Sequence, residues 1–279
     1  MAPILGVIAG SGRLPAAIAC GARERGVRVF GLALKGIAAP DFNNSVDEAV
    51  TLPLGKVQAL FDALEAHGVV EVVLAGGVSK ASLIGGEVEF DERGRRLLAG
   101  LPSLEDDRLL AAMIREFESA GIRVLPQAEW VPELKVEEGV LGAHAPSEAE
   151  HLDIRFGLRV AETLGGLGAG QCAIVRRGCV LALETVEGTD ATIRRAGESG
   201  AVGAVVVKVA RPDQDPRIDL PVVGPGTIEA MRAAGATVLA VRAGDTLLLD
   251  RSETRRAADA SGIAFLGVGA GQASRGGSQ

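Results

Sequence analysis

Short apolar runs and longer amphipathic stretches alternate along the first half of the chain. The apolar runs have the length and composition of buried strands, and the stretches between them have helical spacing. The strands are expected at residues 4–9, 27–34, 70–75 and 122–125, and the helices at 14–25, 56–67 and 103–121. This alternation predicts a doubly wound, mostly parallel sheet.

The second half repeats the alternation after an interval with little periodicity. Residues 126–147 carry three prolines and two glycines, which is the composition of a connection between domains. Beyond it, strands are expected at 172–175, 180–185, 202–207, 220–223, 237–241 and 246–249, and helices at 148–164, 190–195, 227–234 and 252–260. The first two of these strands flank Arg177-Gly178 and predict a hairpin.

These patterns predict an α/β protein of two domains. We expect an N-terminal Rossmann-like domain at residues 1–128, a linker at 129–147, a C-terminal catalytic α/β domain at 148–270 and a disordered tail at 271–279. Open α/β sheets bind ligands beyond the carboxyl ends of their strands. We therefore expect ligand sites at these strand ends.

Composition excludes several classes of protein. The 279 residues are 47% hydrophobic, enough for a real core, and the net charge of -7 without a basic run argues against nucleic-acid partners. No basic leader and no apolar stretch of membrane-spanning length are present. Three cysteines without CxxC spacing and three scattered histidines argue against disulfides and zinc, and favour a reducing cytoplasm.

A polar block at residues 208–221 separates two apolar runs. It contains three cations and three carboxylates, among them Lys208, Arg217, Asp215 and Asp219, and it is longer than an ordinary connection. Cations can clamp phosphate oxygens, and a carboxylate can hold a divalent metal or position a water molecule. A solvated, charge-balanced loop is the alternative interpretation.

Two glycine turns follow predicted strands. Gly10-Ser11-Gly12 precedes a helix, but Pro15 stands where a dinucleotide fingerprint has its third glycine, which disfavours a nicotinamide cofactor. A phosphate or sugar-hydroxyl site and a plain tight turn both remain open. The second turn is Gly76-Gly77-Val78-Ser79. The two turns are expected to converge on one ligand, although two unrelated turns would give the same pattern.

Acidic residues gather near the end of the strand at 180–185. Glu184, Glu187, Thr189 and Asp190 could supply oxygen ligands to magnesium, and Thr189 could instead cap the next helix. Asp106 and Asp107 are expected to complement a helix dipole. Carboxylates, lysine and arginine without a histidine or cysteine nucleophile suit metal-assisted attack of water on a phosphate.

Several blocks in order resemble the UDP-2,3-diacylglucosamine pyrophosphatase family of the bacterial lipid A pathway, in the form distinct from the calcineurin-like phosphoesterases. The blocks are residues 6–15, 54–56, 75–80, 106–110, 170–171, 187–190, and the positions Lys208, Pro212, Gln214, Asp215, Arg217, Asp219, Pro221 and Gly224. The sequence departs from the family pattern at residues 167–170 and at Lys80-Ala81, in the regions expected to contact uridine and the acyl chains.

The resemblance implies hydrolysis of the pyrophosphate to UMP and 2,3-diacylglucosamine 1-phosphate, with Mg²⁺, by a cytoplasmic homodimer. It also implies that the substrate is held in an active site in the cleft between the two domains. Asp219 is expected to be catalytic and to bind the metal with Glu187 and Asp190, while Lys208 and Arg217 neutralise the pyrophosphate. The substrate is expected to contact both glycine turns, Thr189, Gln214 and Asp215. Weak peripheral contact with the inner membrane would follow from the lipid substrate.

Two rival functions remain open from the residues alone. A non-catalytic sensor of a nucleotide sugar or acyl phosphate would explain the glycine turns, but not so many carboxylates beside cations. A nucleotide-dependent oxidoreductase is the weaker rival, because the third glycine is absent.

Overall fold

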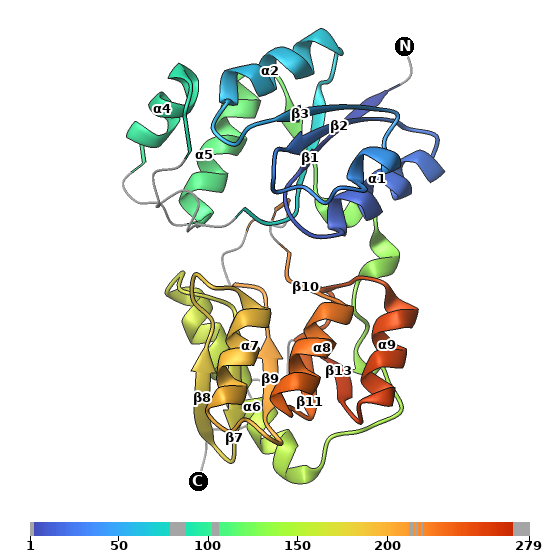
Figure 1. Ribbon diagram of the computed structural model, residues 1–279, viewed down its shortest axis with the longest axis vertical. Helices are drawn as coiled ribbons and strands as arrows, with labels where there is room; N and C mark the ends of the chain where they lie inside the picture. The colour runs from blue at the N-terminus through green and yellow to red at the C-terminus, as the bar shows by residue number, and fades with distance from the viewer. Residues whose placement is uncertain are drawn as a thin grey trace. The chain divides into compact units, whose positions relative to one another are not determined.

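The computed structural model describes residues 3–78, 88–101, 106–211, 215, 217–218 and 220–269, with the side chains of 106 and 107 left out. The chain forms two compact units, which are described separately. Unit 1 comprises Met1–Pro132 with Gln214–Asp219, and unit 2 comprises Glu133–Asp213 with Leu220–Gln279. Both units are α/β, as the sequence predicted (Figure 1).

Unit 1 contains a five-stranded parallel sheet in the order β3-β2-β1-β4-β5. The strands are β1 (Ile4–Ala9), β2 (Arg28–Leu34), β3 (Glu48–Leu52), β4 (Glu71–Ala75) and β5 (Arg123–Val124). The helices are α1 (Leu14–Glu24), α2 (Val57–Ala66), α4 (Glu92–Ala99) and α5 (Asp106–Ser119), with short 3₁₀ turns at Phe42–Ser45, Gln127–Glu129 and Pro132–Leu134. The chain runs outward in opposite directions from β1, so β1 and β4 flank the switch point of the sheet.

One face of this sheet carries the main core of unit 1. Phe30, Leu32 and Val72 point to the side of α2 and α5, where they pack with Phe61 and Phe117. The two phenylalanine rings lie 5.0 Å apart. Ile218, from the polar block, is buried in this same core. That segment therefore belongs to unit 1, although the strands on either side of it in the sequence belong to unit 2.

Unit 2 has a six-stranded mixed sheet in the order β6-β13-β11-β9-β7-β8. Its strands are β6 (Gly139–Val140), β7 (Cys172–Arg176), β8 (Cys179–Leu183), β9 (Val205–Lys208), β11 (Val238–Arg242) and β13 (Ala264–Val268), and β10 (Val222–Val223) pairs separately with β12 (Leu247–Leu248). The predicted hairpin is confirmed as β7–β8, whose turn places Arg177 and Gly178 at positive φ.

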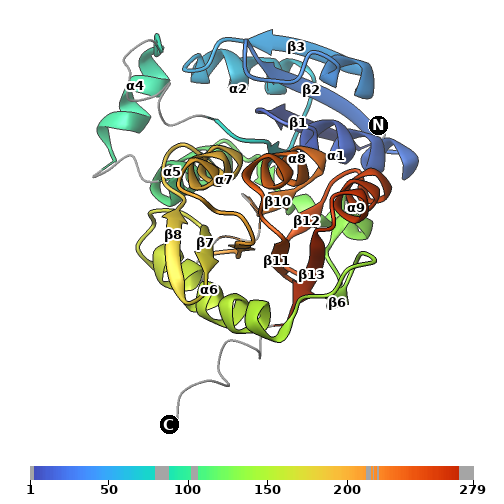
Figure 2. The ribbon, with the colours of Figure 1, turned by 60° about the horizontal axis from the view of Figure 1, so that its bottom comes forward.

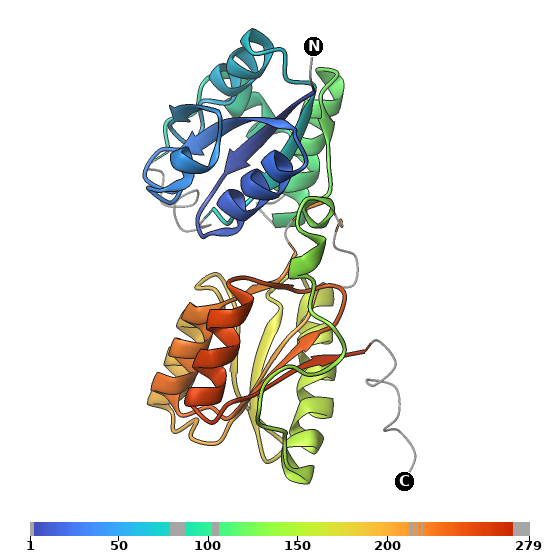
Figure 3. The same cartoon turned by 90° about the vertical axis from the view of Figure 1, so that its right-hand side faces the viewer.

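Helices cover both faces of this sheet. α6 (Glu148–Gly166) lies on one face, and α7 (Thr189–Glu198), α8 (Pro225–Ala234) and α9 (Arg251–Ala260) line the other (Figures 2 and 3). Val205 and Val207 pack toward α6, whereas Val206 packs into the core beneath the other three helices. Burial on both faces explains why β9 reads as an unbroken apolar run.

The structure adds elements that the apolar pattern did not predict. β3 is largely exposed, α4 is strongly polar, and β13 is a short buried strand directly before the glycine-rich end of the chain. β6 lies inside the stretch expected to be a linker and pairs with β13. Within the described residues, no helix combines the length and apolarity needed to cross a bilayer.

Candidate functional site

The two glycine turns of unit 1 touch each other through their backbones. The amide of Gly10 donates to the carbonyl of Ala75 at 2.8 Å, and the amide of Ser11 donates to that of Gly77 at 2.8 Å. A Cβ on Gly10 would lie 2.6 Å from the carbonyl oxygen of Gly77. The predicted meeting of the turns is therefore confirmed, while their binding of a ligand stays a prediction. Ser79 lies outside the described residues.

These contacts determine which backbone amides of the turns remain available to bind an anion. The amides of Gly10 and Ser11 are already donated across the turn pair. An anion at this place would be bound by the amides that follow Gly12, at the beginning of α1, where the helix leaves its first donors unpaired. Pro15 lies in that first turn and has no amide hydrogen to contribute.

Unit 2 places a row of polar side chains across three neighbouring strands. Cys172 pairs directly with Lys208 in the antiparallel register of β7 and β9, and the amide of Glu184 donates to the carbonyl of Cys172 at 2.9 Å. Residues directly opposite each other in antiparallel strands share a face. Lys208, Cys172 and Glu184 therefore form one row, on the side of the sheet covered by α7 and α8.

Lys208 ends β9 and is 7% exposed. Its Nζ donates to the carbonyl of Val222 at 2.8 Å, which ties the end of β9 to β10. A buried ammonium needs such partners, because desolvation of the charge is otherwise costly. Cys172, the residue opposite Lys208, does not balance its positive charge. Burial above all, and the nearby Glu184 carboxylate, raise the pKa of the Cys172 thiol and keep it neutral. Cys172 is thus a small core residue.

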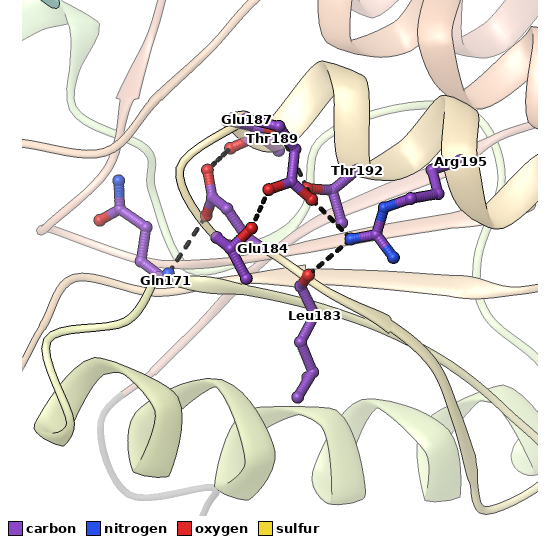
Figure 4. Close-up of polar contacts among 9 residues, drawn as sticks. Gln171, Leu183, Glu184, Glu187, Thr189, Thr192 and Arg195 are labelled. Atoms are coloured by element: carbon purple, nitrogen blue, oxygen red, sulfur yellow. Dashed lines mark hydrogen bonds and ion pairs between the residues drawn. The ribbon is translucent and has the colours of Figure 1, made fainter. Parts of the chain in front are cut away.

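Glu184 is the carboxylate of this row. It is 6% exposed and accepts hydrogen bonds from the hydroxyl of Thr189 at 2.8 Å and the amide of Gln171 at 3.1 Å (Figure 4). A Cβ on Gly170 would collide with the backbone of Glu184, so glycine permits this close approach. The end of β8 and the beginning of β7 are thereby held together around one buried charge.

Asp190 lies where two helices begin. It is in the first turn of α7, and its Oδ1 accepts a hydrogen bond of 3.1 Å from the hydroxyl of Thr227 in the first turn of α8. Helix N-termini favour negative charge, so this position suits Asp190 or a bound anion. The expectation that Thr189 could cap the helix is wrong: Gly188, at φ 82°, is the N-cap, and Thr189 turns its hydroxyl to Glu184 instead.

Glu187 is held by donors of its own loop and helix. It accepts from the hydroxyl of Thr185, from Arg195 at 2.5 Å and from the hydroxyl of Thr192 at 3.1 Å (Figure 4). The Thr185 hydrogen bond above all, with help from Arg195, lowers the pKa of Glu187 to about 2. Binding a metal would require this carboxylate to exchange those partners.

Within the polar block, Asp215 and Arg217 form an ion-pair cluster in unit 1. Arg217 donates to both carboxylate oxygens of Asp215 and, from Nη1, to Glu118 of α5 at 2.9 Å. The Arg217 guanidinium lowers the pKa of Asp215, and Asp215 raises that of Arg217. Gln214 and Asp219 lie outside the described residues, so the predicted roles of these two residues stay predictions.

The predicted site residues thus fall into three groups. Lys208, Thr189 and Asp190 lie near one another in unit 2, the glycine turns meet in unit 1, and Asp215 with Arg217 forms the third group, also in unit 1. A single site that joins Glu187 and Asp190 to the polar block stays a prediction. Among the described residues, no three acidic, histidine or cysteine side chains gather as a metal site.

Two participants were not predicted from the sequence. Thr227 and Glu118 gave no signal of their own, whereas Glu184 was expected among the acidic residues near the end of the strand at 180–185. Thr227 could have been suspected from its place after Gly224-Pro225-Gly226, a helix-starting sequence. Nothing in the sequence around Glu118 distinguishes it from an ordinary exposed helix residue.

Comparison with known protein families shows to which family the chain belongs. Residues 4–134 match the LpxI N-terminal domain, and residues 137–266 match the LpxI C-terminal domain. The chain belongs to the LpxI family. A curated relative, UDP-2,3-diacylglucosamine pyrophosphatase LpxI of Caulobacter vibrioides, is 34% identical over 275 residues, which cover 95% of this chain and 97% of the relative. The resemblance seen in the sequence blocks is thereby confirmed.

Two solved structures resemble this LpxI chain only weakly. The biotin carboxylase subunit of pyruvate carboxylase is 14% identical, covers 67% of this chain and 39% of its own, and has a TM-score of 0.28. The biotin carboxylase domain of a 2-oxoglutarate carboxylase from Hydrogenobacter thermophilus is 10% identical, covers 70% and 41%, and also has a TM-score of 0.28. At these scores neither likeness bears on fold or function.

The contact between the glycine turns predicts a sharp difference between two neighbouring substitutions. Gly10→Ala would push a methyl group against backbone carbonyls and should lower the free energy of unfolding by about 1–3 kcal/mol. Gly77→Ala is the matched control, because its Cβ would meet only the hydroxyl of Ser11, at 3.3 Å. Urea denaturation of both variants measures the difference. Equal losses would contradict the proposed contact.

The lowered pKa of Glu187 predicts an acid-dependent loss of stability. A carboxyl whose pKa is lower in the folded state stabilises the fold above its unfolded pKa, about 4.3, and loses that effect as the pH falls through the folded value, about 2. Glu187→Gln should therefore cost about 1 kcal/mol at pH 7 and almost nothing at pH 2. Denaturation of both proteins across this range tests it, and a pH-independent cost would refute it.

Proposed function

We propose that the protein hydrolyses the pyrophosphate bond of UDP-2,3-diacylglucosamine to UMP and 2,3-diacylglucosamine 1-phosphate in lipid A biosynthesis. One observation carries the proposal: both LpxI domains match, and a relative named for this activity is 34% identical over nearly the whole length of both chains. The polar residues of unit 2 support it, because they suit a charged phosphate substrate.

Hydrolysis of the pyrophosphate by water does not require a covalent intermediate with the protein. A water oxygen bonds to one phosphorus, the bond from that phosphorus to the bridging oxygen breaks, and the bridging oxygen leaves with the other phosphate. We propose that Asp219 orients the water and accepts its proton. Lys208 and Arg217 would stabilise the negative charge that builds up on the phosphate oxygens.

Arg217 is prepared for such a role by its neighbours. Its guanidinium is held in a fixed plane by Asp215 and Glu118, with the side chain one-third exposed. A guanidinium that is already oriented loses less conformational freedom when it binds a phosphate. Asp215 would then act on the substrate through Arg217, and not by direct attack.

Magnesium is part of the proposal. When bound, it would supply positive charge that neutralises the pyrophosphate. Asp190 and Asp219 are the side chains that would hold it. Asp190 suits this role because its hydrogen bond to Thr227 leaves it room for a further partner, whereas Glu187 would first have to leave Arg195. Glu184 would then balance the charge of Lys208.

We further propose a cytoplasmic homodimer whose contact with the inner membrane is weak and peripheral. The substrate would carry two acyl chains, so it would be drawn from or near a lipid surface. The net charge of -7 opposes strong adsorption to anionic lipids, which supports a brief encounter over stable binding.

Release of UMP from purified protein tests the activity. With UDP-2,3-diacylglucosamine and Mg²⁺, wild type should release UMP, and Asp219→Ala and Lys208→Gln should each slow release by at least about 10²-fold. Asp245→Ala is the control, because Asp245 is an exposed carboxylate in another loop of unit 2. EDTA should abolish release, and added Mg²⁺ should restore it. Binding of the substrate without UMP release would instead favour a sensor.

A further inference from the structure

A cavity of about 190 Å³ lies at the carboxyl ends of the first four strands of unit 1. It is lined by residues at or just after the ends of β1 to β4 and by residues of α2, α4 and α5, the elements labelled in Figure 1. Gly10 and Gly76, from the paired turns, lie at its edge. Ligands of open α/β sheets bind at this end of the strands.

The described lining of this cavity is almost entirely apolar. Leucine, valine, isoleucine, proline, phenylalanine and methionine side chains form it, and Lys56 is the one charged residue among those described. The Nζ of Lys56 pairs with Glu89 at 3.1 Å, and Glu89 is 86% exposed. The charge therefore points to solvent while the stem of Lys56 lies along the wall. Apart from Lys56, no described side chain of the lining carries a charge that could bind a phosphate.

Helix α4 is attached to both α2 and α5. The carboxylate of Asp91 caps α4 through the amide of Gly94 at 2.8 Å and also accepts from the amide of Gln58, at the beginning of α2, at 2.7 Å. Arg93 lies 3.5 Å above the ring of Phe61 in α2 and pairs with Glu116 of α5 at 2.6 Å. Contacts outside the cavity thus hold α4 in place, although the lining itself is apolar.

We propose that this cavity holds one acyl chain of the substrate and that Leu98 and Met113 limit the chain length accepted. The inference rests on the proposed function for the identity of the ligand. A dry apolar cavity of about 150 Å³ takes up benzene, so a space of this size can hold a segment of hydrocarbon. The paired glycine turns at its edge would lie beside the sugar, to which the acyl chain is attached.

An unbranched acyl chain fits the lining better than a ring-bearing ligand. The lining is rich in leucine and includes Met113, side chains that adapt to a flexible chain. Phe90 is the one aromatic residue among the described lining, so stacking of a flat ring on both faces has no support there. Each buried methylene group contributes about fourfold in affinity, equivalent to about 0.8 kcal/mol.

Chain-length preference tests the proposal. The measured quantity is the ratio of kcat/KM for substrates with long and with short acyl chains, because a general loss of activity leaves that ratio unchanged. Leu98→Trp should fill the cavity and reduce the preference for the long chain by about tenfold. Met113→Ala should enlarge it and shift the preference toward longer chains. Ala99→Trp is the matched control, since Ala99 is exposed on the same helix and does not line the cavity.

A binding measurement separates this proposal from the proposed function. Dodecanoate below its micelle concentration should raise the Tm of the wild-type protein and of Ala99→Trp, but not that of Leu98→Trp. If UMP is released, but all variants share one length preference and one response to dodecanoate, the cavity proposal is overturned and the enzymatic function stands. If no UMP is released while dodecanoate binding depends on Leu98, the function falls and the cavity remains an acyl site.

Discussion

The direct backbone contact between the turns that follow β1 and β4 constrains everything at the carboxyl end of the unit 1 sheet. Gly10 and Gly76 lie so close that neither has room for a side chain. The contact fixes the edge of the apolar cavity and uses two amides that a phosphate-binding turn would otherwise offer. Unit 1 therefore has an apolar cavity, partly open to solvent, at the place where a dinucleotide fold presents a diphosphate loop.

Unit 2 buries two charged side chains, Lys208 and Glu184, on one face of its sheet. Lys208 and Glu184 lie on either side of Cys172, and Asp190 lies at the beginnings of two helices. Each charge has hydrogen-bond partners, but the arrangement costs more stability than an apolar core would. Such a cost is common where polar groups serve binding or catalysis.

Much of the fold could be predicted from periodicity. Strands buried on both faces, such as β1 and β9, read as apolar runs because helices cover each side. β3 and α4 gave no such signal, since β3 lies at the sheet edge and α4 is anchored by Asp91 and Arg93, not by an apolar stripe. Their stability comes from partners that are distant in sequence, which a local pattern does not contain.

The candidate site was predictable in its residue types but less so in its grouping. The order of blocks revealed the family, and the meeting of the two glycine turns followed from the rule for parallel strands. The pairing of Glu187 with Arg195 and of Arg217 with Glu118 did not follow, because each depends on which helix face a side chain meets. Charged side chains that are close in sequence can form ion pairs with residues of different elements.

Ile218 completes the core of unit 1 from a segment encoded after most of unit 2. A gene fragment ending near Pro132 would encode α5 and its phenylalanine without the residue that packs against them. The two halves of the coding sequence are therefore not interchangeable modules, and recombination that exchanged one half for that of a distant relative would break a hydrophobic contact as well as a linker. Such an arrangement favours inheritance of both halves as one piece.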